Sequence, residues 1–241
     1  MHKKGTDFCA DKDIREFPNY GVAEVAHYLQ IPQTTLRSWV MGRSGRSYPT
    51  DVGTRFLEPL IAMQDQNRRL LSFMNVVELH VLDAIRRQHQ IRLVKIRQAL
   101  RYLRQHFPSR HPLADQKFET DGQDLFIQRY GQLINISQSG QLAMRSLLGA
   151  DLQRLERDPQ GIAIRLYPFT RKRLPDEPRL VVIDPYVSFG RPALTGSGIA
   201  TAAIAERYKA GESVGELADD YGRDRLEIEE AIRCELQIEA A

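Results

Sequence analysis

The residues whose types best suit a chemical role are small polar and basic side chains within one short segment. They are Thr34, Thr35, Arg37 and Ser38. A guanidinium group can donate two hydrogen bonds to the edge of a guanine, and hydroxyl groups can bond to bases or to phosphates. Leu36 and Trp39 lie among them and give the same segment an apolar side. A helix divided in this way would present the polar residues to the major groove of DNA.

Two short helices must position these side chains. Apolar residues spaced i, i+3, i+4 and i+7 predict the first helix: Val22, Val25, Ala26 and Leu29. Gly21 occupies the N-cap position, and Glu24 three residues later completes a capping box with glycine in place of serine. Gln30 and Ile31 break the pattern, and Pro32 suits the first turn of a second helix. The pair predicts a helix-turn-helix; the alternative is a helical hairpin inside a core.

The segment resembles the winged helix-turn-helix of MerR-type regulators. Seven positions match the usual pattern of that family: Glu24, Ala26, Ile31, Thr35, Leu36, Arg37 and Trp39. Gly21 replaces the usual hydroxyl cap, and Gln30 replaces the glycine of the turn. A left-handed glutamine costs about 1 kcal/mol relative to glycine, so we expect the turn to be weakened or reshaped.

The wing of such a domain is expected between residues 60 and 73. Two apolar runs there flank the polar sequence QDQNR, which predicts a hairpin with Arg68 and Arg69 near its tip. Arg43 and Arg46 lie in a loop of small residues after the second helix. We expect these four arginines to contact phosphates.

Two further helices follow the wing. Asn75 and Glu78 resemble a capping box for a helix over residues 76–88, and a second helix is predicted over residues 92–107. Its basic residues point away from its apolar side, where they either form a solvated face or touch phosphate: Arg92, Lys95, Arg101 and Arg104.

The charge distribution separates the two halves of the chain. Residues 1–111 hold 18 Lys and Arg against 10 Asp and Glu, a net charge of +8. Residues 112–241 hold 16 against 21, a net charge of −5. Only the first part therefore suits a polyanionic partner.

The middle of the chain predicts a small α+β region. Two apolar segments, 125–129 and 133–136, suggest a hairpin around Tyr130-Gly131-Gln132. A leucine-rich helix that reaches Leu155 is expected to end at the turn 158–161, followed by a strand with alternating apolar residues over 162–166. We expect this region to mediate a homodimer, through Leu142, Leu147 and Leu148. The polar, proline-bounded segment 170–178 is interpreted as a linker.

The last part of the chain predicts three helices. They are expected over residues 201–209, from the capping box of Ser213 and Glu216 to Tyr221, and onward from Asp224. In the first of them, Tyr208 is expected to face inward with Ile204 and Ala205. Residues 224–239 carry six acidic and two basic side chains, a net charge of −4, and DNA phosphates would repel such a helix. We therefore interpret this unit as a protein-binding or structural module.

The segment 182–199 resembles the hallmark of a small antitoxin-like bacterial domain. The resemblance lies in Pro185, Val187, Gly190, Pro192, Leu194 and Gly196; Ser197-Gly198 stand where that family has Thr-Arg. Together with the MerR-like start, the chain resembles the longer VapB-type antitoxins, whose partners are PIN-like ribonuclease toxins. The resemblance implies two candidate cationic sites for toxin binding, the cluster Arg171-Lys172-Arg173 and Arg191. The alternative is that the cluster is solvated and that Arg191 braces its own loop. Glu229 and Glu230, on the acidic helix, are candidates for contact with a basic rim of the toxin.

Enzymatic chemistry has little support in the sequence. The six histidines show no zinc-ligand pattern, and the only cysteines, Cys9 and Cys234, have no metal-site or disulfide spacing. Gly196-Ser197-Gly198 lacks the third glycine and the βαβ unit of a dinucleotide loop. We expect no enzyme activity, no cofactor and no bound metal. The amino-terminal sequence lacks a signal-peptide core and no apolar run could cross a membrane, so a cytoplasmic location is expected.

The sequence thus predicts an α+β fold, mainly α, in three parts. Residues 1–110 would form a MerR-like winged helix-turn-helix, 111–179 a small α+β dimerisation region with a linker, and 180–241 an antitoxin-like three-helix unit. The leading hypothesis is an antitoxin that neutralises a ribonuclease toxin and binds double-stranded operator DNA of its own operon. The alternative is a ligand-sensing MerR-type transcription regulator.

Overall fold

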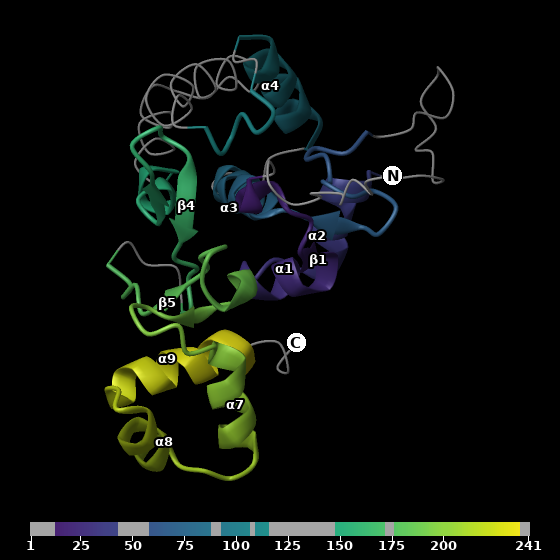
Figure 1. Cartoon of the computed structure of the whole chain (residues 1–241). Coiled ribbons are helices and arrows are strands. Elements are labelled where there is room, and N and C mark those ends of the chain that lie inside the picture. Colours follow the sequence, from purple (N-terminus) through teal and green to yellow (C-terminus); the bar gives the residue numbers. More distant parts are fainter. Residues whose placement is uncertain are drawn as a thin grey trace, which may run out of the picture.

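The computed structural model describes residues 13–42, 58–87, 93–106, 109–115, 148–171 and 176–236 (Figure 1). The predicted class, α+β and mainly helical, is confirmed; the strands within these ranges form short antiparallel pairs. The N-terminal elements are η1 (Ile14–Glu16), β1 (Tyr20–Gly21), α1 (Val22–Tyr28), α2 (Gln33–Met41), β2 (Leu70–Leu71), α3 (Phe73–Arg87) and α4 (Leu93–His106). The remaining named elements are β3 (Leu155–Arg157), β4 (Ala163–Leu166), β5 (Val181–Val182), η3 (Ser188–Gly190), β6 (Ala193–Leu194), α7 (Thr201–Lys209), α8 (Val214–Tyr221) and α9 (Arg225–Leu236).

Helices α1 and α2 form the predicted helix-turn-helix. The Gly21 amide donates to Glu24 Oε2 over 3.1 Å at the start of α1. The turn contains Gln30 with φ of 53°, so glutamine does adopt the left-handed conformation. Pro32 is the N-cap of α2 and not part of its first turn. The Ile31 amide donates to the Ala26 carbonyl over 2.9 Å, which closes the turn despite the missing glycine.

Replacing Gln30 by glycine tests the cost of this turn. Glycine adopts positive φ without steric penalty, so Gln30→Gly should raise the free energy of unfolding by up to about 1 kcal/mol. Chemical denaturation of both proteins would measure the difference. Gln33→Gly, at the first residue of α2 where φ is negative, is the control and should not stabilise. A destabilised Gln30→Gly variant would show that glutamine side-chain contacts outweigh the strain.

The wing differs from the predicted hairpin. Asp65 and Leu70 exchange two backbone hydrogen bonds, of 3.0 and 3.1 Å, and so close a tight turn over residues 66–69. β2 pairs along its length with β1, and the preceding residues Leu60 and Ile61 are buried without forming a strand. The wing therefore joins the start of the helix-turn-helix through β1.

Helix α3 begins three residues earlier than predicted. The Ser72 hydroxyl accepts a hydrogen bond from the Asn75 amide, and the Asn75 side chain accepts one from the Ser72 amide. The capping pair is therefore Ser72 with Asn75, and the prediction of Asn75 with Glu78 was wrong. Phe73, expected in the wing, packs in the core as the first residue of α3.

The middle region shares the core of the N-terminal helices. The helix expected to reach residue 155 ends at 152, and Leu155 belongs to β3, which pairs with β4 around the turn 158–161. Leu148, proposed for a two-fold contact, is buried in the chain's own core. Leu142, Leu147 and the hairpin predicted around residues 130–132 lie outside the described residues.

Two apolar cores hold the described residues. The larger contains residues from Tyr20 to Ile183, and the smaller joins Leu194 to helices α7–α9. Backbone hydrogen bonds between Leu166 and Ile183, of 2.8 and 3.0 Å, connect the middle region to the last part. These contacts cross the domain boundary expected at residue 179.

The C-terminal three-helix unit has the predicted capping box at the start of α8. The Ser213 hydroxyl accepts a hydrogen bond from the Glu216 amide, and the Ser213 amide donates one to Glu216 Oε2. Two predictions about its surface were wrong. Tyr208 was expected to face inward but is exposed, whereas Glu230, expected on the acidic outer face of α9, is fully buried.

A buried histidine ties the N-terminal segment to α3. His111 Nδ1 lies 2.9 Å from Glu78 Oε2, and His111 Nε2 lies 3.1 Å from Glu16 Oε2. Burial disfavours the charged ring, but hydrogen bonds and charge from Glu78 and then Glu16 outweigh this and raise the pKa of His111. The folded state therefore binds this proton more tightly than the unfolded chain does.

This linkage predicts how stability changes with pH. His111 should contribute stability below its ordinary pKa, and the contribution should fade as the pH rises through the raised value. The difference in unfolding free energy between wild type and His111→Gln should therefore be full below the ordinary pKa of about 6.5 and shrink as the pH rises through the raised pKa. Denaturant titrations at a series of pH values from below that point upward would measure it, with His106→Gln as the exposed control. A difference that grows with pH would contradict the assignment.

Candidate nucleic-acid interface

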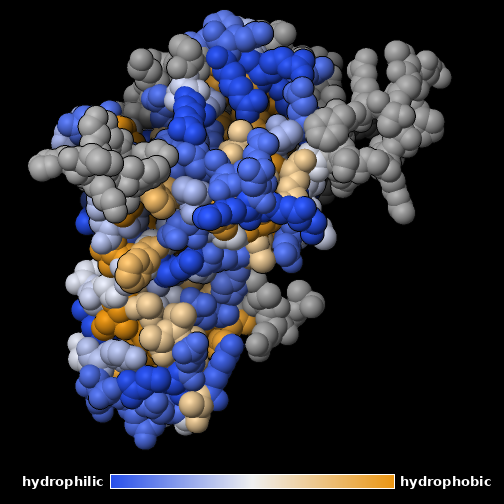
Figure 2. All heavy atoms as spheres, turned by 45° about the vertical axis from the view of Figure 1, so that its right-hand side comes forward, coloured by the Kyte–Doolittle hydropathy of each residue, from blue (hydrophilic) through white to orange (hydrophobic). Residues whose placement is uncertain are grey.

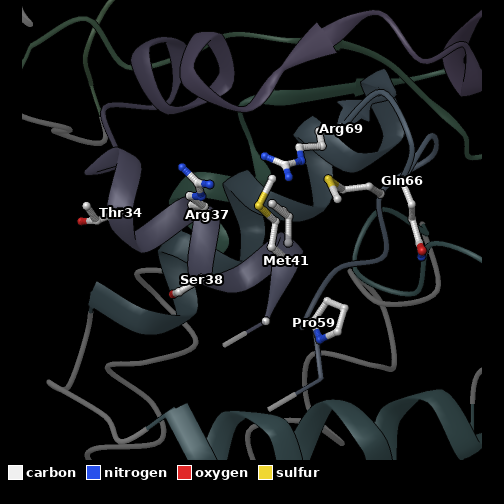
Figure 3. A pocket seen from close by; sticks show the side chains of 10 residues that line it. Thr34, Arg37, Ser38, Met41, Pro59, Gln66 and Arg69 are labelled. Carbon is white, nitrogen blue, oxygen red and sulfur yellow. The ribbon is translucent and has the colours of Figure 1, made fainter. Parts of the chain in front are cut away.

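The outward side of α2 and the wing enclose one open hollow of about 770 Å³ (Figure 3). Thr34, Arg37 and Ser38 line it from α2, and Gln66 and Arg69 line it from the wing. Figure 3 shows the guanidinium groups of Arg37 and Arg69 directed into the same space, with Met41 beside them. Two elements separated by about thirty residues thus present basic and polar groups to one surface.

The position of α2 is fixed from its buried side. The Trp39 ring is completely buried, and the Arg86 guanidinium lies 5.3 Å from its ring centroid. The Trp39 carbonyl accepts a hydrogen bond of 2.6 Å from the Leu60 amide, which leads into the wing. Arg97 and Arg104 of α4 donate to the carbonyls of Glu58 and Leu60. Part of the basic face of α4 therefore supports the wing and is not simply solvated.

The residues of α2 predicted to contact DNA differ in their exposure to solvent and in their hydrogen bonds. Thr34 and Arg37 are exposed, whereas Thr35 is half-buried and does not line the hollow. The Ser38 hydroxyl donates to the Thr35 carbonyl over 2.7 Å, so its proton is used inside α2. An acceptor lone pair of Ser38 remains for a base amino group or a water.

The two wing arginines face different surroundings. Arg69 has φ of 57° and lines the hollow together with α2. The Arg68 amide donates to Asp65 over 2.9 Å, and Arg68 lines a second hollow that also contains Asp13, Glu16 and Arg110. Sequence spacing placed both at the wing tip but could not separate them. It also missed Gln66, whose only signal was its place in the polar turn. Arg43 and Arg46 lie outside the described residues.

The candidate toxin-binding residues are engaged within the chain. Arg171 Nε donates to Glu230 Oε1 over 2.7 Å, and Thr170 and Arg233 also bind this buried carboxylate. Burial raises the pKa of Glu230, but hydrogen bonds from Arg171 and Thr170 outweigh it and lower the pKa. Glu230 is therefore not available as an exposed contact in this structure, whereas Glu229 is exposed. Lys172 and Arg173 lie outside the described residues.

Arg191 reaches the helix-turn-helix and does not brace its own loop. Its guanidinium pairs with Glu24 of α1 and lies 5.8 Å from the centroid of the Tyr20 ring. Gly190 packs so closely on Tyr20 that a Cβ atom there would lie 2.1 Å from the Tyr20 hydroxyl. The segment expected as a linker is likewise anchored, because the amides of Thr170 and Arg171 both donate to buried Glu177 over 2.6 Å.

Two negative findings apply to the described residues. They contain no group of three or more His, Cys, Asp or Glu side chains that could hold a metal ion. None of their helices combines the length and apolarity that crossing a membrane requires.

Comparison with known proteins finds one family model that matches each end of the chain. Residues 18–100 match a family model described as "Putative DNA-binding HTH domain", and residues 181–233 match "Protein of unknown function (DUF433)". "Putative antitoxin VapB45" of Mycobacterium tuberculosis is 29% identical over 90% of this chain and 93% of its own length. "Uncharacterized protein Rv2308" of the same organism is 27% identical over 88% of each chain.

A solved structure has the same fold. The crystal structure of Rv2018 from Mycobacterium tuberculosis superposes with a TM-score of 0.64 at 25% identity, over 90% of this chain and 98% of that one. The similarity to VapB45 and to the two family models confirms the predicted resemblance to VapB-type antitoxins with an N-terminal helix-turn-helix.

The shared hollow predicts distinct effects for its two arginines. Arg37→Ala should weaken binding to promoter DNA from the chain's own operon by about 1–3 kcal/mol and relax sequence preference if Arg37 bonds to a base. Arg69→Ala should lower affinity for all sequences and reduce the log–log salt slope by about 1. Fluorescence anisotropy titrations at several salt concentrations would measure both.

Arg101→Ala is the matched control, since Arg101 is exposed on α4 and does not line the hollow. Its affinity and salt slope should equal those of wild type. Equal affinities for wild type and Arg37→Ala would contradict the assignment of α2 as the helix that contacts bases.

Proposed function

We propose that this chain is an antitoxin that binds operator DNA through α2 and the wing and holds a cognate ribonuclease toxin inactive. The main observation in support of DNA binding is that Arg37 of α2 and Arg69 of the wing line the same hollow. The similarity to the family model for a DNA-binding helix-turn-helix supports it. The excess of 18 basic over 10 acidic side chains in residues 1–111 would favour association with phosphates.

The antitoxin half rests on the similarity to VapB45 over nearly the whole chain. The residues after 180 are the natural place for a protein partner, because α9 is acidic and would be repelled by DNA. An acidic helix would be attracted to a nuclease that has a basic surface for RNA, and such attraction speeds association. We further propose that the toxin is PIN-like, that the protein is a homodimer in the cytoplasm, and that it represses its own operon.

Co-expression in a host cell tests the proposal. The product of the neighbouring gene alone should arrest growth and degrade RNA, and the full-length chain should restore growth. The double variant Arg37→Ala/Arg69→Ala should lose repression of a reporter driven by the operon promoter, yet still restore growth. This separation is expected because the hollow and the acidic helix lie in different parts of the fold.

Full-length variants are preferable to a chain ending at Phe169. That cut would remove Ile183 from the larger core and break its two hydrogen bonds with Leu166. Failure of the wild-type chain to restore growth would contradict the antitoxin proposal. Failure of the double variant alone would contradict the division of the two tasks.

A further inference from the structure

The loop at η3 holds an aromatic side chain in an unfavourable position. Phe189 is 89% exposed, and Ser188 and Phe189 have φ of 47° and 54°. Residues other than glycine rarely adopt this backbone conformation. Exposure of the phenyl ring to water also forgoes the favourable free energy of burying its apolar surface. Two consecutive strained residues persist where the surrounding structure enforces them, and such strain clusters at functional sites.

Contacts from distant parts of the chain enforce this conformation. Asn19 Nδ2 donates to the Phe189 carbonyl over 2.6 Å, and the Ser188 hydroxyl donates to the Gly198 carbonyl over 2.6 Å. Gly190 is seated against the Tyr20 hydroxyl, and Arg191 pairs with Glu24. The backbone on both sides of Phe189 is therefore fixed, and the ring is held outward.

Phe189 is part of a larger apolar surface. Tyr186 is 64% exposed in the same loop, and Phe17 and Ile14 of the η1 region are 48% and 40% exposed. These four residues and Pro185 line one hollow of about 420 Å³ and are here called the Phe189 surface. Figure 2 shows one face of the molecule, on which apolar residues lie among a mostly hydrophilic surface. Exposed aromatic groups gathered in this way mark contact sites for other proteins.

The charges beside the Phe189 surface do not favour nucleic acid as the partner. Arginines next to it are paired with carboxylates: Arg15 with Asp13 and Asp158, Arg110 with Glu16, and Arg191 with Glu24. Glu16 also contacts His111, and the adjoining hollow holds both Arg68 and Asp65. Positive and negative groups are thus balanced, so the surface offers no excess of positive charge to phosphates, and its exposed aromatic groups suit a protein partner.

The similarity to an antitoxin over nearly the whole chain indicates which protein this partner is. On the premise that the proposed function is correct, we propose that the Phe189 surface is the docking site for the toxin. Phe189 and Tyr186 insert into an apolar pocket of that nuclease.

A variant that relieves the strain tests the docking site without unfolding the protein. Phe189→Gly removes the ring but adopts positive φ freely, so its melting temperature should be no lower than that of wild type. Its Kd for the purified product of the neighbouring gene should rise at least about 30-fold, the effect expected of a central aromatic contact. Isothermal titration calorimetry with the full-length chain would measure this. Tyr186→Ser should also weaken binding.

Tyr208→Ser is the matched control, because Tyr208 is an exposed aromatic residue on α7, 40% exposed and outside both the Phe189 surface and α9. It should leave the Kd unchanged. A Phe189→Gly variant that binds as tightly as wild type would overturn the docking site and leave the proposed function intact. If wild type itself does not bind, the proposed function fails and the docking site fails with it.

Two further measurements separate other occupants. Light scattering should give the same mass for wild type and Phe189→Gly; a dimer lost in the variant would assign the surface to a second copy and overturn toxin docking. Promoter affinity should also be unchanged, since Phe189 lies outside the hollow formed by α2 and the wing. Loss of DNA affinity with unchanged toxin affinity would likewise overturn the proposal.

Discussion

One carboxylate, that of Glu24, connects the parts of this protein. It accepts a hydrogen bond from the Gly21 amide at the start of α1 and one of 2.7 Å from the Tyr28 hydroxyl at its end, and it pairs with Arg191. A single hydrogen bond contributes only about 1 kcal/mol. The first two contacts hold Glu24 against α1, and the third joins the helix-turn-helix to the C-terminal loop. Position and orientation of α1, and through the turn those of α2, therefore depend on a residue 167 positions away in sequence.

Local chemistry made much of the fold predictable. Glu24 three residues after Gly21, and Glu216 three residues after Ser213, identified two helix starts correctly. The spacing of Leu36 and Trp39 correctly divided α2 into a buried and an exposed side. These features succeed because capping and amphipathic periodicity act within one or two helical turns.

The incorrect predictions concern residues whose structure is decided by contacts with residues distant in the sequence. Leu155 fits a helical pattern, but its pairing with Leu166 makes it part of β3. Glu230 fits an acidic surface, but Thr170 and Arg171 bind it and allow it to be buried. Arg68 and Arg69 are neighbours in the sequence, but they line different hollows, and Arg69 has a left-handed backbone conformation. No pattern in the neighbouring residues encodes any of these partners.

The contact between Gly190 and Tyr20 has a consequence for biosynthesis. Asn19 and Phe189, which hydrogen-bond beside it, are separated by 170 residues. At a translation rate of about 5–20 residues per second, roughly 10–35 s pass between synthesis of the two ends of this contact. Tyr20 therefore remains uncovered by the loop while most of the chain is synthesised. The N-terminal half of the nascent chain therefore completes its contacts with the loop only after the last quarter of the chain has left the ribosome.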